Sequence, residues 1–97
     1  MGRNSRNNSE HAEQTLHVRV SKATELLWEG EARAISTKNL EGPLDVLPMH
    51  ANFITLLKEV PIHIVDVDGV KKTFTFPLAV MSVRDNAVHI YTEITGT

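Results

Sequence analysis

Apolar and polar side chains alternate along four segments of the chain. In residues 16–21 every second side chain is apolar, starting with Leu16, and this period of two is typical of a strand with one buried face. The same alternation returns in residues 60–64, 73–76 and 88–91. Because a half-buried strand requires this pattern, we expect all four segments to be β-strands.

Turn signals separate these segments. Asp68-Gly69 predicts a two-residue hairpin loop, because both residues are suited to the positive φ angles that such a loop needs. Asp85-Asn86 indicates a second loop of the same kind. We therefore expect two hairpins, one near residues 60–77 and one near residues 79–94.

Shorter apolar segments predict four more strands, with Gly30, Gly42-Pro43 and Pro48 as separators. These strands are expected at residues 26–28, 32–37, 45–47 and 54–57. A helix over residues 51–61 can also be drawn, but residues 53–57 are short, aromatic and β-branched, which favours a strand. Many short strands with regular turns predict an all-β fold, a two-layer antiparallel β-sandwich in which each sheet covers the apolar face of the other.

The length of 97 residues, with 41% apolar and 23% charged residues, fits one globular domain. Residues 1–14 contain no Leu, Ile, Val or Phe and are expected to be a disordered N-terminal tail, which leaves residues 15–97 for the sandwich. The chain has no cysteine. Disulfides, thiolate metal sites and cysteine-protease chemistry are therefore excluded.

Charge and hydropathy also limit the classes of partner. The net charge is −2 and the ten Lys and Arg residues are scattered, so the basic patch of a nucleic-acid-binding protein is missing. The longest apolar run, residues 76–81, is far shorter than the roughly 18 residues of a membrane helix. We expect no nucleic-acid partner and no direct insertion into a membrane.

The residues that could carry chemistry have simpler explanations. His17, His63 and His89 lie on the outward phase of three different strands, so they could share a zinc ion only if those strands were neighbours, and a solvated strand face is favoured. Asp66 and Asp68 flank a turn where aspartate is common. The sequence has neither a G-x-S-x-G motif nor a glycine-rich phosphate loop. We expect no catalytic, cofactor-binding or metal-binding residues.

Two apolar clusters do not fit strict alternation. Leu78 and Met81 fall on opposite phases of residues 76–81, and Trp28 directly follows two leucines. A bulge or rearranged core would explain both clusters, and so would an outer face covered by a partner protein. Trp28, Leu78 and Met81 are therefore candidate interface residues.

Residues 41–50, which read Glu-Gly-Pro-Leu-Asp-Val-Leu-Pro-Met-His, are followed by an apolar segment over residues 51–57. Together these residues resemble the signature of the N-terminal β-sandwich domain of the ATP synthase epsilon subunit, which is called delta in mitochondria. Three further segments match in order: residues 16–20 as the opening strand, residues 28–31 as an F-x-G-E turn, and residues 83–88 as the closing hairpin. The resemblance covers residues 15–94.

The chain also departs from the family pattern. Residues 76–80 read Phe-Pro-Leu-Ala-Val where the family usually has Val-Ser-Gly-Gly-Phe, and Asn52 stands where many members have proline. Pro43 stands where an acidic or small residue is common. The resemblance implies a domain without the C-terminal helical hairpin of typical epsilon subunits, so the roles of that hairpin do not carry over.

The resemblance implies a non-catalytic central-stalk subunit of a rotary ATP synthase, without a cofactor. Such a subunit docks on the gamma shaft and on the membrane ring that carries the ions, and it lies peripherally on the cytoplasmic side of the membrane. The alternative is a stand-alone β-sandwich adaptor or regulatory protein that is no longer part of a synthase.

The loop that would face the ring spans residues 41–50. Its candidate contact residues are Glu41, Pro43, Asp45, Pro48 and His50. Pro48 stiffens the part of this loop that carries His50. His50 either contacts a partner or hydrogen-bonds a carbonyl of its own loop, and the second role is favoured.

Overall fold

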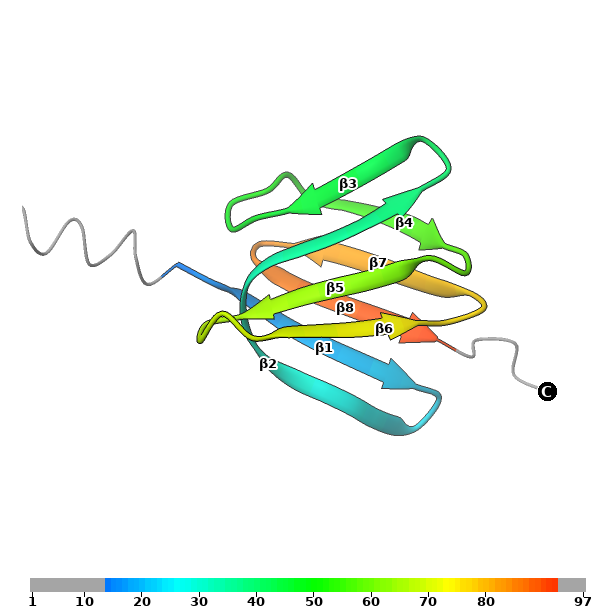
Figure 1. Cartoon of the computed structure of the whole chain (residues 1–97), viewed down its shortest axis with the longest axis horizontal. Helices are drawn as coiled ribbons and strands as arrows, with labels where there is room; N and C mark the ends of the chain where they lie inside the picture. The colour runs from blue at the N-terminus through cyan, green and yellow to red at the C-terminus, as the bar shows by residue number, and fades with distance from the viewer. Residues whose placement is uncertain (1–13, 93–97) are drawn as a thin grey trace, which may run out of the picture.

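The structure is a computed structural model that describes residues 14–92, and these residues form eight strands and no helix (Figure 1). The strands are β1 (Leu16–Lys22), β2 (Glu25–Asn39), β3 (Gly42–Val46), β4 (Phe53–Leu57), β5 (Pro61–Asp66), β6 (Lys71–Thr75), β7 (Ala79–Arg84) and β8 (Ala87–Thr92). The all-β prediction is confirmed, and the segment that could have been a helix contains β4.

The strands form one curled sheet that folds over itself into two layers (Figure 1). Their order is β4-β7-β8-β1-β2-β5-β6, and β3 also pairs with β2. β1 and β8 run parallel, whereas the other pairs are antiparallel. The long strand β2 joins the layers, because residues 25–32 pair with β1 and residues 35–39 pair with β3.

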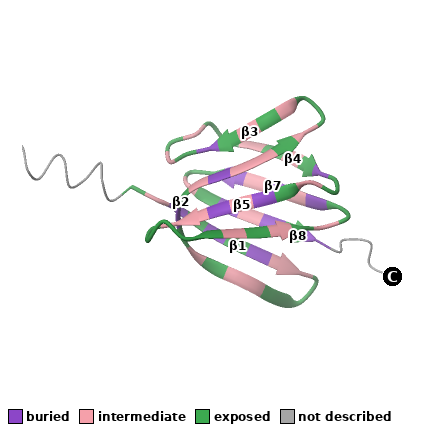
Figure 2. Ribbon diagram, viewed as in Figure 1, coloured by how far each residue is buried: buried purple, intermediate pink, exposed green. Residues whose placement is uncertain are grey.

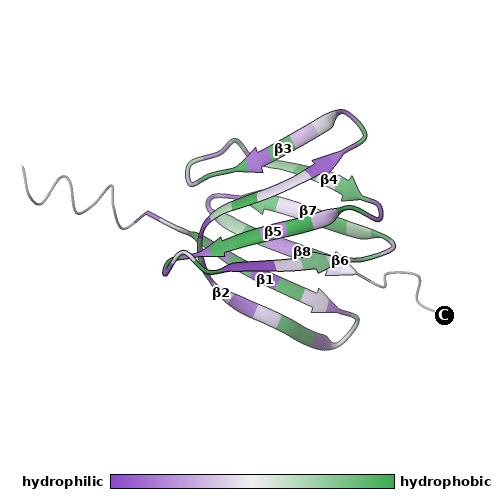
Figure 3. Ribbon diagram, viewed as in Figure 1, coloured by the Kyte–Doolittle hydropathy of each residue, from purple (hydrophilic) through white to green (hydrophobic). Residues whose placement is uncertain are grey.

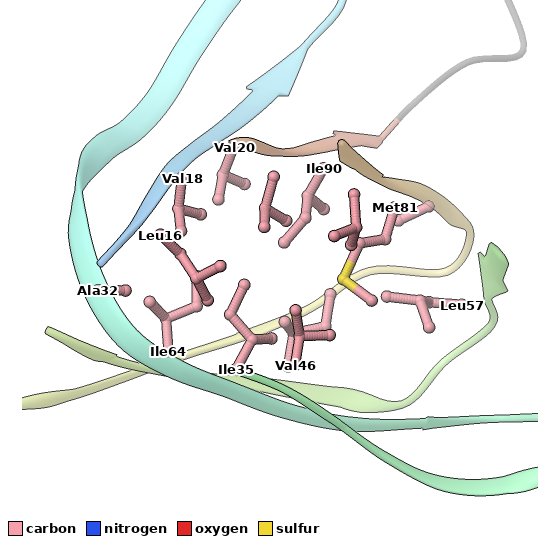
Figure 4. Close-up of a cluster of buried hydrophobic side chains, with 14 residues drawn as sticks. Leu16, Val18, Val20, Ala32, Ile35, Val46, Leu57, Ile64, Met81 and Ile90 are labelled. Carbon is pink, nitrogen blue, oxygen red and sulfur yellow. The ribbon is translucent and has the colours of Figure 1, made fainter. Parts of the chain in front are cut away.

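The apolar core lies between the two layers. Figure 4 shows Val18, Val20 and Ile90 on one side of this space and Ile35 and Ile64 on the other. All five side chains are fully buried. Burial of one such aliphatic side chain contributes about 1.5–3 kcal/mol, so this double row of side chains is the main source of stability.

β2 is longer than the sequence predicts. Gly30 does not separate two strands, and residues 28–31 are not a turn, because β2 continues through them. Gly30 pairs with Val18 of β1. A bulge opposite Val20 and Ser21 gives β2 one extra residue, so Leu27 and Trp28 both pack against the core although they are adjacent. Of the two explanations offered for this cluster, the structure therefore has the bulge.

One of the two predicted hairpin loops differs from the prediction, and the other agrees with it. The β5–β6 loop has three residues, because the Asp66 amide donates to the Val70 carbonyl, and only Gly69 has a positive φ, of 84°. The prediction of a two-residue loop at Asp68-Gly69 is therefore wrong. The side chain of Asp66 supports this loop by accepting from the amides of residues 68 and 70. At Asp85-Asn86 the two-residue loop is confirmed, with φ angles of 51° and 68°.

The broken alternation of residues 76–81 has a simple cause. Residues 76–78 connect β6 to β7, and these strands belong to different layers of the sandwich. The alternation starts again in β7, where Ala79, Met81 and Val83 face the core. The phase changes because the chain crosses between layers.

Two predictions extend beyond the described residues. Almost all of the expected N-terminal tail, residues 1–13, lies outside them, as do residues 93 and 94 of the second hairpin. The division into a tail and a sandwich domain therefore stays a prediction.

Candidate docking surface

Large apolar side chains are exposed along the outer side of β4. β4 lies at one end of the strand order and pairs only with β7 among the described strands. Its inner residues include the buried Leu57, whereas Ile54 is 72% exposed and Leu56 is 57% exposed. β4 thus carries residues that are both exposed (Figure 2) and hydrophobic (Figure 3).

Two neighbouring leucines extend this apolar surface. Leu40, in the β2–β3 turn, is 98% exposed, and Leu78 lies in the β6–β7 connection. With Leu56 and Val60 they line a groove of about 460 Å³, and Lys38 and Lys58 lie among the polar residues that line it. We call the exposed residues Leu40, Ile54, Leu56 and Leu78 the β4 face.

Hydrogen bonds hold the β2–β3 turn against β4. The Asn39 side-chain amide donates to the Thr55 hydroxyl over 3.0 Å. The oxygen of the same side chain accepts from the Glu41 amide over 2.9 Å. Gly42 completes the turn with a φ of 124°, which is unfavourable for other residues. One wall of the groove is therefore fixed by side-chain hydrogen bonds.

The loop between β3 and β4 is attached to the β7–β8 turn. The Met49 amide donates to the Asn86 side-chain oxygen over 2.6 Å, and the Asp85 amide donates to the Asn52 side-chain oxygen over 2.9 Å. The His50 amide donates to the Leu47 carbonyl. The bonds accepted by Asn86 and Asn52 connect two loops that are more than thirty residues apart in sequence, and the bond to Leu47 lies within the β3–β4 loop.

His50 serves the loop that carries it. Its Nδ1 lies 2.9 Å from the Ala51 carbonyl oxygen, and its ring packs at 5.1 Å from the ring of Phe53. This contact corresponds to the favoured role for His50, a hydrogen bond to a carbonyl of its own loop. The side chain is half-buried, and contact with a partner stays a prediction.

The five predicted ring-facing residues do not belong to one loop. Residues 42–46 form β3, so Glu41 lies at one end of this strand while Pro48 and His50 follow its other end (Figure 1). Pro43 and Asp45 are exposed on β3 itself. Because β3 separates Glu41 from His50, the prediction that one loop carries all five residues is wrong. Their contact with a ring partner stays a prediction.

The other three candidate residues are placed differently. Met81 is fully buried in the core and does not reach the surface, so its assignment to an interface is wrong. Trp28 packs against the core and is only partly exposed. Leu78 is 36% exposed and lines the groove. Of these three, only Leu78 belongs to the β4 face. Ile54 and Leu56 were not predicted as interface residues. The only sequence signal for them is that they occupy the outward-facing positions of a short predicted strand.

A charged cluster covers the outer side of β1 and β2. The ring nitrogens of His17 lie 2.6 Å from carboxylate oxygens of Glu31 and Glu29. Both nitrogens can donate only when the ring is protonated, and the pKa of His17 is raised by its hydrogen bonds to Glu31 and then Glu29. The pKa of Glu31 is lowered, first by the Thr15 hydroxyl and then by His17.

His89 lies on the strand next to His17 but in a different environment. Its ring stacks on that of Tyr91 at 3.9 Å, and burial followed by the charge of Arg19 lowers its pKa. His63 lies on β5 and contacts the hydroxyl of Thr73. Among residues 14–92, no group of three or more His, Cys, Asp or Glu side chains is arranged to hold a metal ion. The same residues include no helix of the length and hydropathy needed to span a bilayer.

A family model and similar curated proteins indicate the same family for this chain. The model of the family described as "ATP synthase, Delta/Epsilon chain, beta-sandwich domain" matches residues 15–95. The ATP synthase epsilon chain of Clostridium botulinum is 38% identical over 61 residues, which are 63% of this chain and 46% of that one. The epsilon chain of Delftia acidovorans is 29% identical over 79 residues, 81% of this chain and 57% of that one. The chain thus spans about half the length of these curated relatives.

Solved structures share the fold. A chain from the Euglena gracilis mitochondrial ATP synthase, an OSCP/F1/c-ring assembly, matches with a TM-score of 0.75 and 20% identity, over 81% of this chain and 51% of that one. A chain from the Tetrahymena thermophila central stalk and c-ring matches with a TM-score of 0.65 and 20% identity, over 81% and 63%. Since the family match includes every described strand, this chain belongs to the family of ATP synthase delta/epsilon chains, through their β-sandwich domain.

Proposed function

We propose that this chain is a non-catalytic central-stalk subunit of a rotary ATP synthase. It docks on a gamma-like shaft subunit and on the ring that carries the ions, and so couples ion flow to ATP synthesis. It lies peripherally on the cytoplasmic side of the membrane. Family membership supports this proposal. The observation that carries it is the β4 face, because Ile54 and Leu56 expose large apolar side chains on an edge strand.

The β4 face is the part of the surface best suited to the shaft. Its centre is apolar, while Lys38 and Lys58 add charge beside it, and an apolar centre with a polar rim is the usual composition of a protein interface. The groove adds a concave shape that a protruding side chain or helix of the shaft can fill. We therefore assign the shaft contact to the β4 face, which includes Leu78 of the candidate interface residues but not Trp28 or Met81.

The ring contact is assigned to the end of the sandwich near Glu41 and Pro43. Glu41 is exposed in the β2–β3 turn and Pro43 is exposed at the start of β3, next to the β4 face. A subunit that joins a shaft to a ring needs two adjoining surfaces, and this corner of the molecule provides both. His50 and Pro48, at the opposite end of β3, are outside this contact.

The proposal is tested by recovering the chain from native membranes. We expect the wild-type chain to bring down the catalytic alpha and beta subunits together with the shaft. Ile54→Lys puts a charge into the β4 face, and recovery should fall at least about tenfold, the equivalent of about 1.4 kcal/mol. The matched control is Val70→Lys, which changes an exposed valine in the β5–β6 loop.

Two results would contradict the proposal. If the wild-type chain brings down no synthase subunits, it is not part of this complex, and the adaptor alternative takes its place. If Ile54→Lys and Val70→Lys bind equally well, the shaft does not dock on the β4 face.

A further inference from the structure

Two asparagines join the β3–β4 loop to the β7–β8 turn in a reciprocal way. Asn86 of the turn accepts a hydrogen bond from the backbone of Met49 in the loop, over 2.6 Å. Asn52 of the loop accepts one from the backbone of Asp85 in the turn, over 2.9 Å. Each loop thus provides one side-chain acceptor and one backbone donor. We call Asn52 and Asn86 the asparagine pair.

The hydrogen bonds of the asparagine pair lie at residues whose backbone has unfavourable positive φ angles. Met49, Asp85 and Asn86 have φ angles of 72°, 51° and 68°, and positive φ is costly for a residue with a β-carbon. Asparagine adopts a positive φ more readily than most residues do, so Asn86 is suited to its position. Methionine has no such preference, so the backbone of Met49 is less favourable. Without its bond to Asn86, the loop around Met49 would lose a contact that holds it in this conformation.

Asn52 also lies directly before β4. Asn52 is followed by Phe53, the first residue of β4, which pairs with Val83 of β7. β4 has only this one strand neighbour among the described residues, and it carries Ile54 and Leu56. An edge strand is more easily displaced than a central one, so a fixed starting point determines where its side chains lie.

We propose that Asn52 and Asn86 are positioning residues that hold β4 and the β3–β4 loop in the conformation that binds the shaft. This inference rests on the proposed function. The pair does not contact the shaft itself. It lowers the conformational entropy that docking would otherwise cost, because the β4 face is already ordered before the partner arrives.

The test compares binding to synthase that has been isolated from the source cells and stripped of this subunit. Asn52→Ala and Asn86→Gly each remove one side-chain acceptor, and glycine at position 86 keeps the positive φ of the turn. One lost hydrogen bond corresponds to roughly three- to tenfold weaker binding. Asn52→Asp and Asn86→Asp keep an oxygen acceptor, so they should restore binding to near the wild-type value.

A control separates positioning from general stability. Asp66→Ala removes bonds of the same kind, from the amides of residues 68 and 70 to the Asp66 side chain, in the loop before β6, which lies at the other end of the strand order from β4. It should lower the melting temperature without weakening binding. If the alanine and glycine variants bind as tightly as the wild type, or the aspartate variants fail to restore binding, the inference is wrong while the proposed function stands. If the wild-type chain itself does not bind, both fail.

Discussion

The indole ring of Trp28 lies over Gly30, two residues further along β2. Its Cζ2 atom is 2.8 Å from the position that a β-carbon on Gly30 would occupy. Gly30 pairs with the buried Val18, so this contact closes the part of the inner face where β2 has no side chain. The tryptophan thus takes the place of the missing side chain.

Gly30→Ala should therefore destabilise the fold, although alanine favours a strand more than glycine does. The new methyl group displaces the indole ring, and overpacking of this kind costs about 1–3 kcal/mol. Chemical denaturation measures the loss. In a Trp28→Phe background the ring is smaller and the cost should shrink. An unchanged or higher stability of the single variant would show that the ring moves aside freely.

Variants of Met81 show whether this residue contributes to the core or to an interface. Because its side chain is fully buried, Met81→Ala should cost about 2–5 kcal/mol of unfolding free energy, whereas Met81→Leu should cost less than about 1.5 kcal/mol. The folded Met81→Leu protein should still bind the synthase like the wild type. If that variant keeps its stability but loses binding, Met81 belongs to an interface after all.

Gly69 tests the hairpin loop between β5 and β6. Its φ is 84°, and a β-carbon there would meet no atom within 4 Å. Gly69→Ala should therefore destabilise through backbone strain alone, by about 1–2 kcal/mol. Thermal unfolding measures the effect. A variant as stable as the wild type would mean that the loop relaxes to a negative φ at no cost.

The His17 cluster predicts a pH dependence of stability. The pKa of His17 is raised in the folded chain by Glu31 and then Glu29, so the folded state binds this proton more tightly than the unfolded state. The resulting stability is fully present below the unfolded value of 6.5 and is lost as the pH rises through the folded pKa. His17→Gln should remove this component.

Other titratable groups near His17 also contribute to the pH dependence of stability. Glu29, Glu31 and Arg19 surround His17, and His89 lies on the adjacent strand. The pKa of His89 is lowered, so its contribution has the opposite sign and is lost as the pH falls below 6.5. The difference in melting temperature between wild type and His17→Gln isolates the first effect. A difference that stays constant from pH 5 to 9 would contradict the assignment.

Sequence patterns predicted most strands because one face of each is buried. In β1 and β8 the alternation is strict, and the buried Val18 and Ile90 are where the period places them. The pattern predicts that Gly30 separates two strands, because nothing in the sequence indicates that Trp28 covers it. The sequence also does not show which apolar side chains are buried. Met81 was wrongly predicted to be an interface residue and Leu56 was not predicted to be exposed, because both are apolar and only the packing of the two layers places Met81 in the core and Leu56 on the surface.

The asparagine pair could not have been predicted from the sequence. Asn52 and Asn86 are 34 residues apart, and neither belongs to a motif that indicates a contact between them. Asn86 carried only a turn signal, which the structure confirms. Their reciprocal bonds depend on two loops meeting at the same end of the sandwich, which requires the strand order to be known.

The most direct test of the β4 face uses the absence of cysteine from the chain. Leu56→Cys introduces a single thiol in the β4 face, and Lys71→Cys introduces one on β6, at the other end of the strand order. Each variant is assembled in native membranes and treated with a short thiol-reactive cross-linker. We expect a cross-link from position 56 to the shaft subunit and none from position 71. Recovery of both variants in the complex, with a cross-link to the shaft from position 71 but not from position 56, would contradict it.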